Sequence, residues 1–275
     1  MSAAPALPPA HPPAGAGLTA SGRFGWLDVA RGVALLAMAI YHFSFDLAMF
    51  GLIDPRAPVS FPLREFARLI ATSFLLLVGV GLVIGHGRGI RWRPFWRRFA
   101  LIAGAAGLIT AGSYAAALYT GAPQFLIYHG ILHMIAIGSL AALPLVRAPW
   151  WVAVVTAALV AWVGLGTGAT IGESPWIWWT GLSATRGPSF DFVPFFPAFA
   201  AVAAGVAVAK LAGLGTRPGS ARPGSARSGA APGPPRAMPP LQRPFAWAGR
   251  HSLLVYLAHQ PVLIGLLWLY VQVAR

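Results

Sequence analysis

The chain has 275 residues, of which 57% are hydrophobic and only 9% are charged, and its mean hydropathy is +0.68. A soluble domain carries about 25% charged residues, so this composition indicates an integral membrane protein. The sequence contains no cysteine, which excludes disulfide bonds, thiolate metal ligands and a cysteine acyl carrier.

The hydropathy pattern divides the chain into a tail, a set of apolar helices and a linker. Residues 1–22 are rich in Pro and Ala and nearly uncharged, which predicts a disordered tail. Residues 213–247 repeat Arg-Pro-Gly-Ser-Ala and are predicted to be a flexible basic linker. Apolar stretches of helical length cover residues 27–50, 66–84, 99–119, 124–145, 150–165, 193–210 and 251–273. We expect an all-α bundle of about seven transmembrane helices, in which residues 23–212 and 248–275 form one membrane domain.

The net charge of +14 is concentrated in two loops, one between the second and third predicted helices and one after the sixth. These loops hold Arg88, Arg91, Arg93, Arg97 and Arg98 in the first case, and Lys210, Arg217, Arg222, Arg227, Arg236, Arg243 and Arg250 in the second. The positive-inside rule makes both loops cytoplasmic, which places the N-terminus inside and the C-terminus outside. The charge therefore marks one face of a lipid bilayer and predicts no nucleic-acid partner. The oligomeric state stays open.

The first predicted helix, residues 27–50, carries four ionisable side chains in an apolar sequence: Asp28, Arg31, His42 and Asp46. At about 1.5 Å per residue this helix spans ~35 Å, enough to cross a bilayer, and at about 100° per residue the four side chains fall within an arc of roughly 60°. Charges are costly in hydrocarbon, so we expect this arc to face the protein interior or a wet cavity. A purely structural polar seam would give the same pattern.

Histidines on two other predicted helices lie at a similar depth. His129 and His133 are spaced one helical turn apart on the fourth predicted helix, so we expect them on one face. His259 lies near the middle of the seventh and is followed by Gln260. A lone histidine on an apolar helix is usually a hydrogen-bonded core residue, but several at one level favour a shared site with His42.

Four motifs carry a resemblance to a known family. They are Leu27-Asp28-Val29-Ala30-Arg31-Gly32 followed by His42, HGILHMIAIG at 129–138, SFDFVPFFPAF at 189–199, and GRHSLLVYLAHQPVLIG at 249–265. In this order they resemble the bacterial relatives of the heparan-alpha-glucosaminide N-acetyltransferase catalytic domain. The ten residues between Arg31 and His42 are similar to the first-helix motif of the acyltransferase-3-like membrane acyltransferases.

This resemblance implies a multi-pass enzyme that moves an acyl group, most simply acetyl, from cytoplasmic acetyl-CoA to an amine or hydroxyl. The implied acceptor is an envelope glycan or a lipid-linked acceptor that faces outward. The eukaryotic member places its catalytic histidine in the non-cytosolic loop after the first helix, whereas this sequence has no histidine between His42 and His86. The role of His42 is therefore carried over from the wider acyltransferase pattern.

Acyl transfer needs a base, groups that stabilise the oxyanion, and a site for the CoA phosphates. His42 is the candidate base or acyl carrier, and Asp46, one turn away, is expected to orient it. Arg31 is expected to contact phosphate or the thioester carbonyl, with Asp28 as its partner, although the two can equally form a self-neutralising pair. The remaining catalytic candidates are His133 and His259, as hydrogen-bond donors or substrate contacts.

Binding candidates lie on both sides of the membrane domain. For the acceptor they are His129, Gln260 and Asp191, the last at the outer end of the sixth predicted helix. For the CoA phosphates they are Arg88, Arg91 and Arg93, which the positive-inside rule also explains without a ligand. No metal is expected in an enzyme of this kind.

Two other functions fit the same residues. The spacings His-x-x-x-Asp and His-x-x-x-His suit metal ligands on helices, and histidines on separate membrane helices can hold haem. A metal-binding, haem-binding or proton-coupled membrane transporter is therefore the alternative to an acyltransferase. The third possibility is a non-catalytic membrane partner of an envelope complex.

Overall fold

The structure is a computed structural model that describes residues 25–166, 170–215 and 238–274. The α-helices are α1 Gly25–Met49, α2 Phe61–His86, α3 Trp92–Thr120, α4 Ile131–Ala141, α5 Leu143–Arg147, α6 Trp150–Leu165, α7 Phe195–Leu211, α8 Arg243–Arg250 and α9 Ser252–Ala274. Short 3-10 helices are η1 Ala57–Val59, η2 Pro123–Phe125, η3 Pro175–Thr180 and η4 Pro240–Gln242. The predicted tail at 1–22 and residues 216–237 of the predicted linker lie outside the described residues.

The described residues form an all-helical membrane protein, as the sequence predicts. Helices α1, α2, α3 and α9 are long and apolar enough to cross a bilayer, and α4, α6 and α7 are shorter apolar helices. A helix of 16 or 17 residues reaches about 25 Å, slightly less than the thickness of a bilayer core. The count of about seven spans and the cytoplasmic N-terminus therefore stay predictions.

Glycines allow α2 and α7 to cross with their backbones in contact. A Cβ on Gly79 would lie 2.1 Å from the Val202 carbonyl oxygen, and a Cβ on Gly205 would lie 2.1 Å from that of Leu76. Small residues at such crossings are the usual means of close packing between membrane helices. The main hydrophobic core is built around this contact and includes Leu75 and Val206, which are both almost completely buried.

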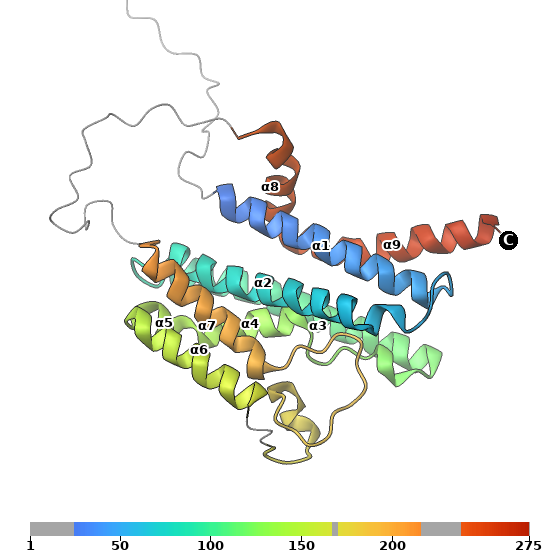
Figure 1. Cartoon of the computed structure of the whole chain (residues 1–275), viewed down its shortest axis with the longest axis horizontal. Coiled ribbons are helices and arrows are strands. Elements are labelled where there is room, and N and C mark those ends of the chain that lie inside the picture. Colours follow the sequence, from blue (N-terminus) through green and yellow to red (C-terminus); the bar gives the residue numbers. More distant parts are fainter. Residues whose placement is uncertain (1–24, 167–169, 216–237, 275) are drawn as a thin grey trace, which may run out of the picture.

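Helix α8 forms at the end of the segment predicted as linker. Pro244 stands in its first turn, where a missing N–H costs nothing, and its apolar side packs on α1. A Cβ on Gly249 would lie 1.8 Å from the Asp28 carbonyl oxygen, and a Cβ on Gly32 would lie 2.0 Å from that of Phe245. In Figure 1 α8 lies near the start of α1, and α9 then runs along α1 toward the C-terminus.

The fourth predicted helix, residues 124–145, is wrong in its first third, residues 124–130. Only Ile131–Ala141 is α-helical, and α5 follows as a separate short helix with Pro144 in its first turn. Residues 126–130 instead run beside the segment before α7, where Val193 N donates to His129 O. His129 therefore lies in a loop before α4, and the expected shared helix face of His129 and His133 does not exist.

Candidate functional site

The centre of the candidate site is a cluster of four polar side chains between α1 and α9. The rings of His42 on α1 and His259 on α9 lie edge to face, with centroids 4.9 Å apart. One turn further along α1, Asp46 is completely buried, and its Oδ1 accepts a 2.7 Å hydrogen bond from Gln260 Nε2. His42 and His259, which the sequence placed at a similar depth, are thus in direct contact, and so are Asp46 and Gln260.

The hydrogen bond of His259 fixes which ring nitrogen is basic. His259 Nδ1 contacts the backbone carbonyl oxygen of Tyr256, which only accepts hydrogen bonds, so Nδ1 carries the hydrogen. In the neutral ring Nε2 then holds a lone pair. This Nε2 is buried and has no hydrogen-bond partner within the described residues.

Two further buried acceptors accompany this nitrogen. Asp46 Oδ2 has no hydrogen-bond partner among the described residues, and neither has Gln260 Oε1, whose amide nitrogen already donates to Asp46. Buried polar atoms are normally paired, so unpaired acceptors in one cluster indicate a missing donor. An amine or hydroxyl of a substrate is such a donor. Asp46 Oδ1 accepts its hydrogen bond from Gln260, and the expected orientation of His42 by Asp46 stays a prediction.

The arc of ionisable residues on α1 faces the protein interior, as expected. Asp28 is buried, and its Oδ1 lies 3.8 Å from Arg31 Nη1. The guanidinium of Arg31 lies against α2, because a Cβ on Gly81 would be 2.7 Å from Arg31 Nη2. Along the helix axis Arg31 is separated from His42 by ~16 Å, so the ion pair and the histidine cluster occupy different depths.

His133 is held on both sides of its ring. Gly130 N donates to His133 Nδ1 at 3.3 Å, and His133 Nε2 lies 3.1 Å from Thr110 Oγ1 on α3. The Thr110 hydroxyl donates to the Ile127 carbonyl oxygen, so His133 Nε2 donates to Thr110. His133 thus ties the loop before α4 to α3, a structural contact that uses both nitrogens.

His129 and Asp191 are joined across the same loop. His129 Nδ1 donates to the Val193 carbonyl oxygen at 2.8 Å, its side chain is buried, and its Nε2 has no partner among the described residues. Asp191 Oδ2 accepts from Ile131 N at 3.2 Å, at the start of α4. Burial lowers the pKa of His129. Burial also raises the pKa of Asp191, against the opposing effect of the Ile131 N–H.

Two tyrosines that the sequence analysis missed lie near Asp191. The Asp191 carboxylate is close enough to act electrostatically on the hydroxyls of both Tyr41 and Tyr256. Tyr256 also packs against Leu132 of α4 and supplies the carbonyl oxygen that orients His259. Both tyrosines had a sequence signal: Tyr41 precedes His42 directly, and Tyr256 precedes His259 by one helical turn.

Arg88 and Arg91 lie in the turn between α2 and α3, and Arg93 lies in the first turn of α3. Arg88, Arg91 and Arg93 are exposed, and Arg91 N donates to His86 Nδ1 at 3.1 Å. Beside this turn is a small cavity lined by Leu82, His86, Phe95, Arg98, Phe99, Ile102, Ala136 and Ser139.

Within the described residues, no group of three or more His, Asp or Glu side chains is arranged to hold a metal ion.

Residues 23–261 match the family described as "Heparan-alpha-glucosaminide N-acetyltransferase, catalytic". The comparisons with curated proteins and with solved structures gave no match. The match contains the first three motifs on which the resemblance rests and most of the fourth, up to residue 261, and it favours an acetyltransferase over a transporter. The chain therefore belongs to the heparan-alpha-glucosaminide N-acetyltransferase catalytic-domain family and is a multi-pass membrane acetyltransferase.

Proposed function

We propose that the protein is a bacterial inner-membrane enzyme that transfers acetyl from cytoplasmic acetyl-CoA to an amine or hydroxyl of an envelope glycan or a lipid-linked acceptor. The observation that carries this proposal is the contact between the His42 and His259 rings beside three buried, unpaired acceptor atoms. A nucleophile that enters this cluster meets lone pairs able to accept its proton. Family membership supplies the reaction type.

In the direct route the acceptor nitrogen or oxygen attacks the thioester carbon. The new bond to the acetyl carbon forms, the C–S bond breaks, and His42 takes the proton that the acceptor loses. The departing thiolate takes this proton from His42 and leaves as CoA thiol. Asp46 stabilises the imidazolium at one turn's distance, held in place by Gln260.

In the covalent route His42 is the acyl carrier. A ring nitrogen of His42 bonds to the acetyl carbon while the C–S bond breaks, and CoA thiol leaves with the imidazole proton. The acceptor then attacks the acetyl carbon of the acyl-imidazole while its bond to the His42 nitrogen breaks, and His259 Nε2 accepts the proton that the acceptor loses. Return of this proton from His259 to His42 restores both neutral imidazoles. The contact between the two rings supports separate roles for His42 as acyl carrier and His259 as base.

The other polar groups have supporting roles. Arg31, which is paired with Asp28, is proposed to contact a phosphate or the thioester carbonyl nearer the cytoplasmic end. Arg88, Arg91 and Arg93 are proposed to bind the CoA phosphates. His129, Asp191 and Gln260 are proposed to contact the acceptor, whereas His133 positions the loop that carries His129.

The experiment is to incubate labelled acetyl-CoA with membranes that contain the wild type, His42→Ala or His259→Ala, and to follow label into envelope glycans and onto the protein. We expect loss of transfer in His42→Ala. Label retained on the wild-type protein and absent from His42→Ala supports the covalent route. Equal transfer by wild type and His42→Ala would overturn the assignment of His42.

A further inference from the structure

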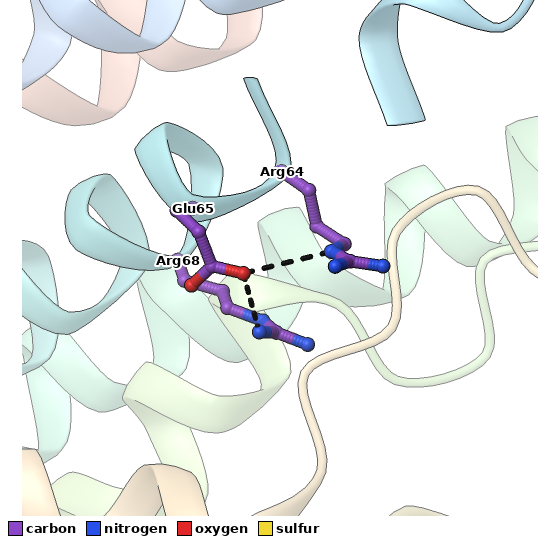
Figure 2. A network of polar contacts seen from close by, with 3 residues as sticks. All are labelled: Arg64, Glu65 and Arg68. Carbon is purple, nitrogen blue, oxygen red and sulfur yellow. Dashed lines mark hydrogen bonds and ion pairs between the residues drawn. The ribbon is translucent and has the colours of Figure 1, made fainter. Parts of the chain in front are cut away.

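The first turns of α2 carry a compact group of charged residues that the proposed mechanism does not use. Glu65 Oε1 accepts a 2.7 Å hydrogen bond from Arg68 Nη1 and lies 3.5 Å from Arg64 Nε. Figure 2 shows both guanidinium groups converging on this one carboxylate oxygen. The triad carries one net positive charge, and most of the N–H donors of the two arginines are left for another partner.

The two arginines stand on the side of α2 that is buried further along the helix. Arg64 and Arg68 are four residues apart, and Arg68 precedes Leu75 by seven, so all three share one helix face. Leu75 is 1% exposed, whereas the side chains of Arg64 and Arg68 are 54% and 66% exposed. The face of α2 that is part of the hydrophobic core at Leu75 is therefore solvent-exposed and basic near the start of the helix.

The acceptor side of the proposed site lies at the same end of the bundle. The Phe190 ring packs between Phe45 of α1 and Phe125 of η2, with centroid distances of 5.2 and 5.1 Å. This holds the segment before α7, which includes Asp191, across that end. Figures 1 and 2 show the segment passing beside the start of α2.

Arginines at this end need an explanation. In the orientation proposed above it is the non-cytoplasmic end, where the positive-inside rule disfavours them. Two planar guanidinium groups fixed by a shared carboxylate match the geometry of a phosphate, which accepts two parallel N–H bonds from each fork. Phe61, seven residues before Arg68 on the same face, is 72% exposed and offers an apolar contact next to the charges.

We propose that Arg64 and Arg68 bind a phosphate or diphosphate group of a lipid-linked acceptor, with its hydrocarbon chain against the apolar surface of α2. This inference rests on the proposed function, because it names the chemical class of the acceptor. The phosphate anchors the acceptor at the membrane surface, and the group to be acetylated reaches inward past Asp191. Glu65 sets the spacing of the arginines and competes with the ligand for their N–H groups.

The test measures equilibrium binding of farnesyl diphosphate to the purified protein in phosphatidylcholine nanodiscs, with farnesol as the phosphate-free comparison. We expect saturable binding of the diphosphate only, at least tenfold weaker in Arg64→Gln/Arg68→Gln and severalfold tighter in Glu65→Gln. The control is Arg147→Gln/Arg243→Gln, which removes the same charge from exposed residues elsewhere and leaves binding unchanged. Elution volume on size-exclusion chromatography verifies the fold of each variant.

A second arm repeats the titration in nanodiscs with 30% phosphatidylglycerol. Binding that persists there supports the acceptor assignment. Competition by phosphatidylglycerol that requires Arg64 and Arg68 assigns the phosphate site to a lipid headgroup and overturns the acceptor assignment. Equal binding by wild type and the double glutamine variant overturns the site. No acetyl donor is present in this measurement, so His42→Ala should bind farnesyl diphosphate like wild type. If the transfer assay fails while farnesyl diphosphate binding is intact, only the proposed acetyltransferase activity is contradicted.

Discussion

Gln260 Nε2 and Asp46 Oδ1, 214 positions apart in the chain, are 2.7 Å from each other and join α9 to α1. Asp46 is completely buried, and its other carboxylate oxygen has no partner among the described residues. A buried carboxylate with one hydrogen bond is poorly compensated, which is the arrangement expected where a substrate supplies the missing donor. The same bond therefore contributes to helix packing and to the site.

Substitutions at this pair should separate stability from activity. In Gln260→Leu, Asp46 Oδ1 loses its donor and neither carboxylate oxygen is then hydrogen-bonded within the described residues, so we expect the free energy of unfolding to fall by about 1–3 kcal/mol. In Asp46→Leu/Gln260→Leu the buried charge is gone, and most of this loss should be recovered although acetyl transfer is abolished. Denaturant titration of the purified variants, together with the transfer assay, measures both quantities. A single variant as stable as wild type would show that the bond contributes nothing.

His259 should act at a different step from His42. Removing a general base lowers the rate by about 10²- to 10⁴-fold, so His259→Gln should lose activity on that scale with little change in stability. If His42 carries the acetyl group, this variant should accumulate labelled protein, because transfer to the acceptor is blocked. Rapid-quench labelling with acetyl-CoA detects the accumulation.

The control for His259 is His251→Gln, because His251 is exposed at the start of α9 and bonds to the Trp247 carbonyl oxygen in a similar way. It should transfer acetyl at the wild-type rate. The combined His42→Ala/His259→Gln variant should be no slower than His42→Ala alone, since His42→Ala already blocks the reaction before the step at which His259 acts. Wild-type kinetics in His259→Gln would remove His259 from the mechanism.

Local pattern was enough to predict the inward polar face of α1 and the common depth of His42 and His259, because both follow from helix geometry and the cost of charge in hydrocarbon. It was not enough for His129. Apolar composition cannot distinguish a buried loop from a helix, and the loop is stabilised by a backbone bond to Val193, far along the chain. Helix α8 was missed for a related reason: it is held by contact with the α1 backbone near Gly32.

The α1–α8 contact leaves no room for a side chain. We expect Gly249→Ala to force α8 away from the Asp28 carbonyl, at a cost of about 1–3 kcal/mol in unfolding free energy, the range for overpacking. Gly265→Ala in α9 is the matched control, since no atom lies within 4 Å of its added Cβ. Thermal unfolding of the two variants in parallel tests this. Equal melting temperatures would mean that the two helices can separate freely.

Asp191 should make stability depend on pH in the acid range. Burial raises the pKa of Asp191 above its ordinary 3.8, so between 3.8 and the raised value the folded carboxyl keeps a proton that the unfolded chain has released. The unfolding free energy contributed by this group therefore falls as pH rises through that window and is constant below it.

The variant Asp191→Asn tests this, because its side chain keeps an oxygen that can accept from Ile131 N but cannot ionise. We expect the stability of the variant relative to wild type to increase as pH is raised from about 4, the unperturbed carboxyl value, and then to level off. His129, whose pKa burial lowers, is present in both proteins and contributes to both profiles. Thermal unfolding of both proteins from acid to neutral pH gives the difference directly, and parallel profiles would show that the Asp191 carboxyl ionises as freely as in water.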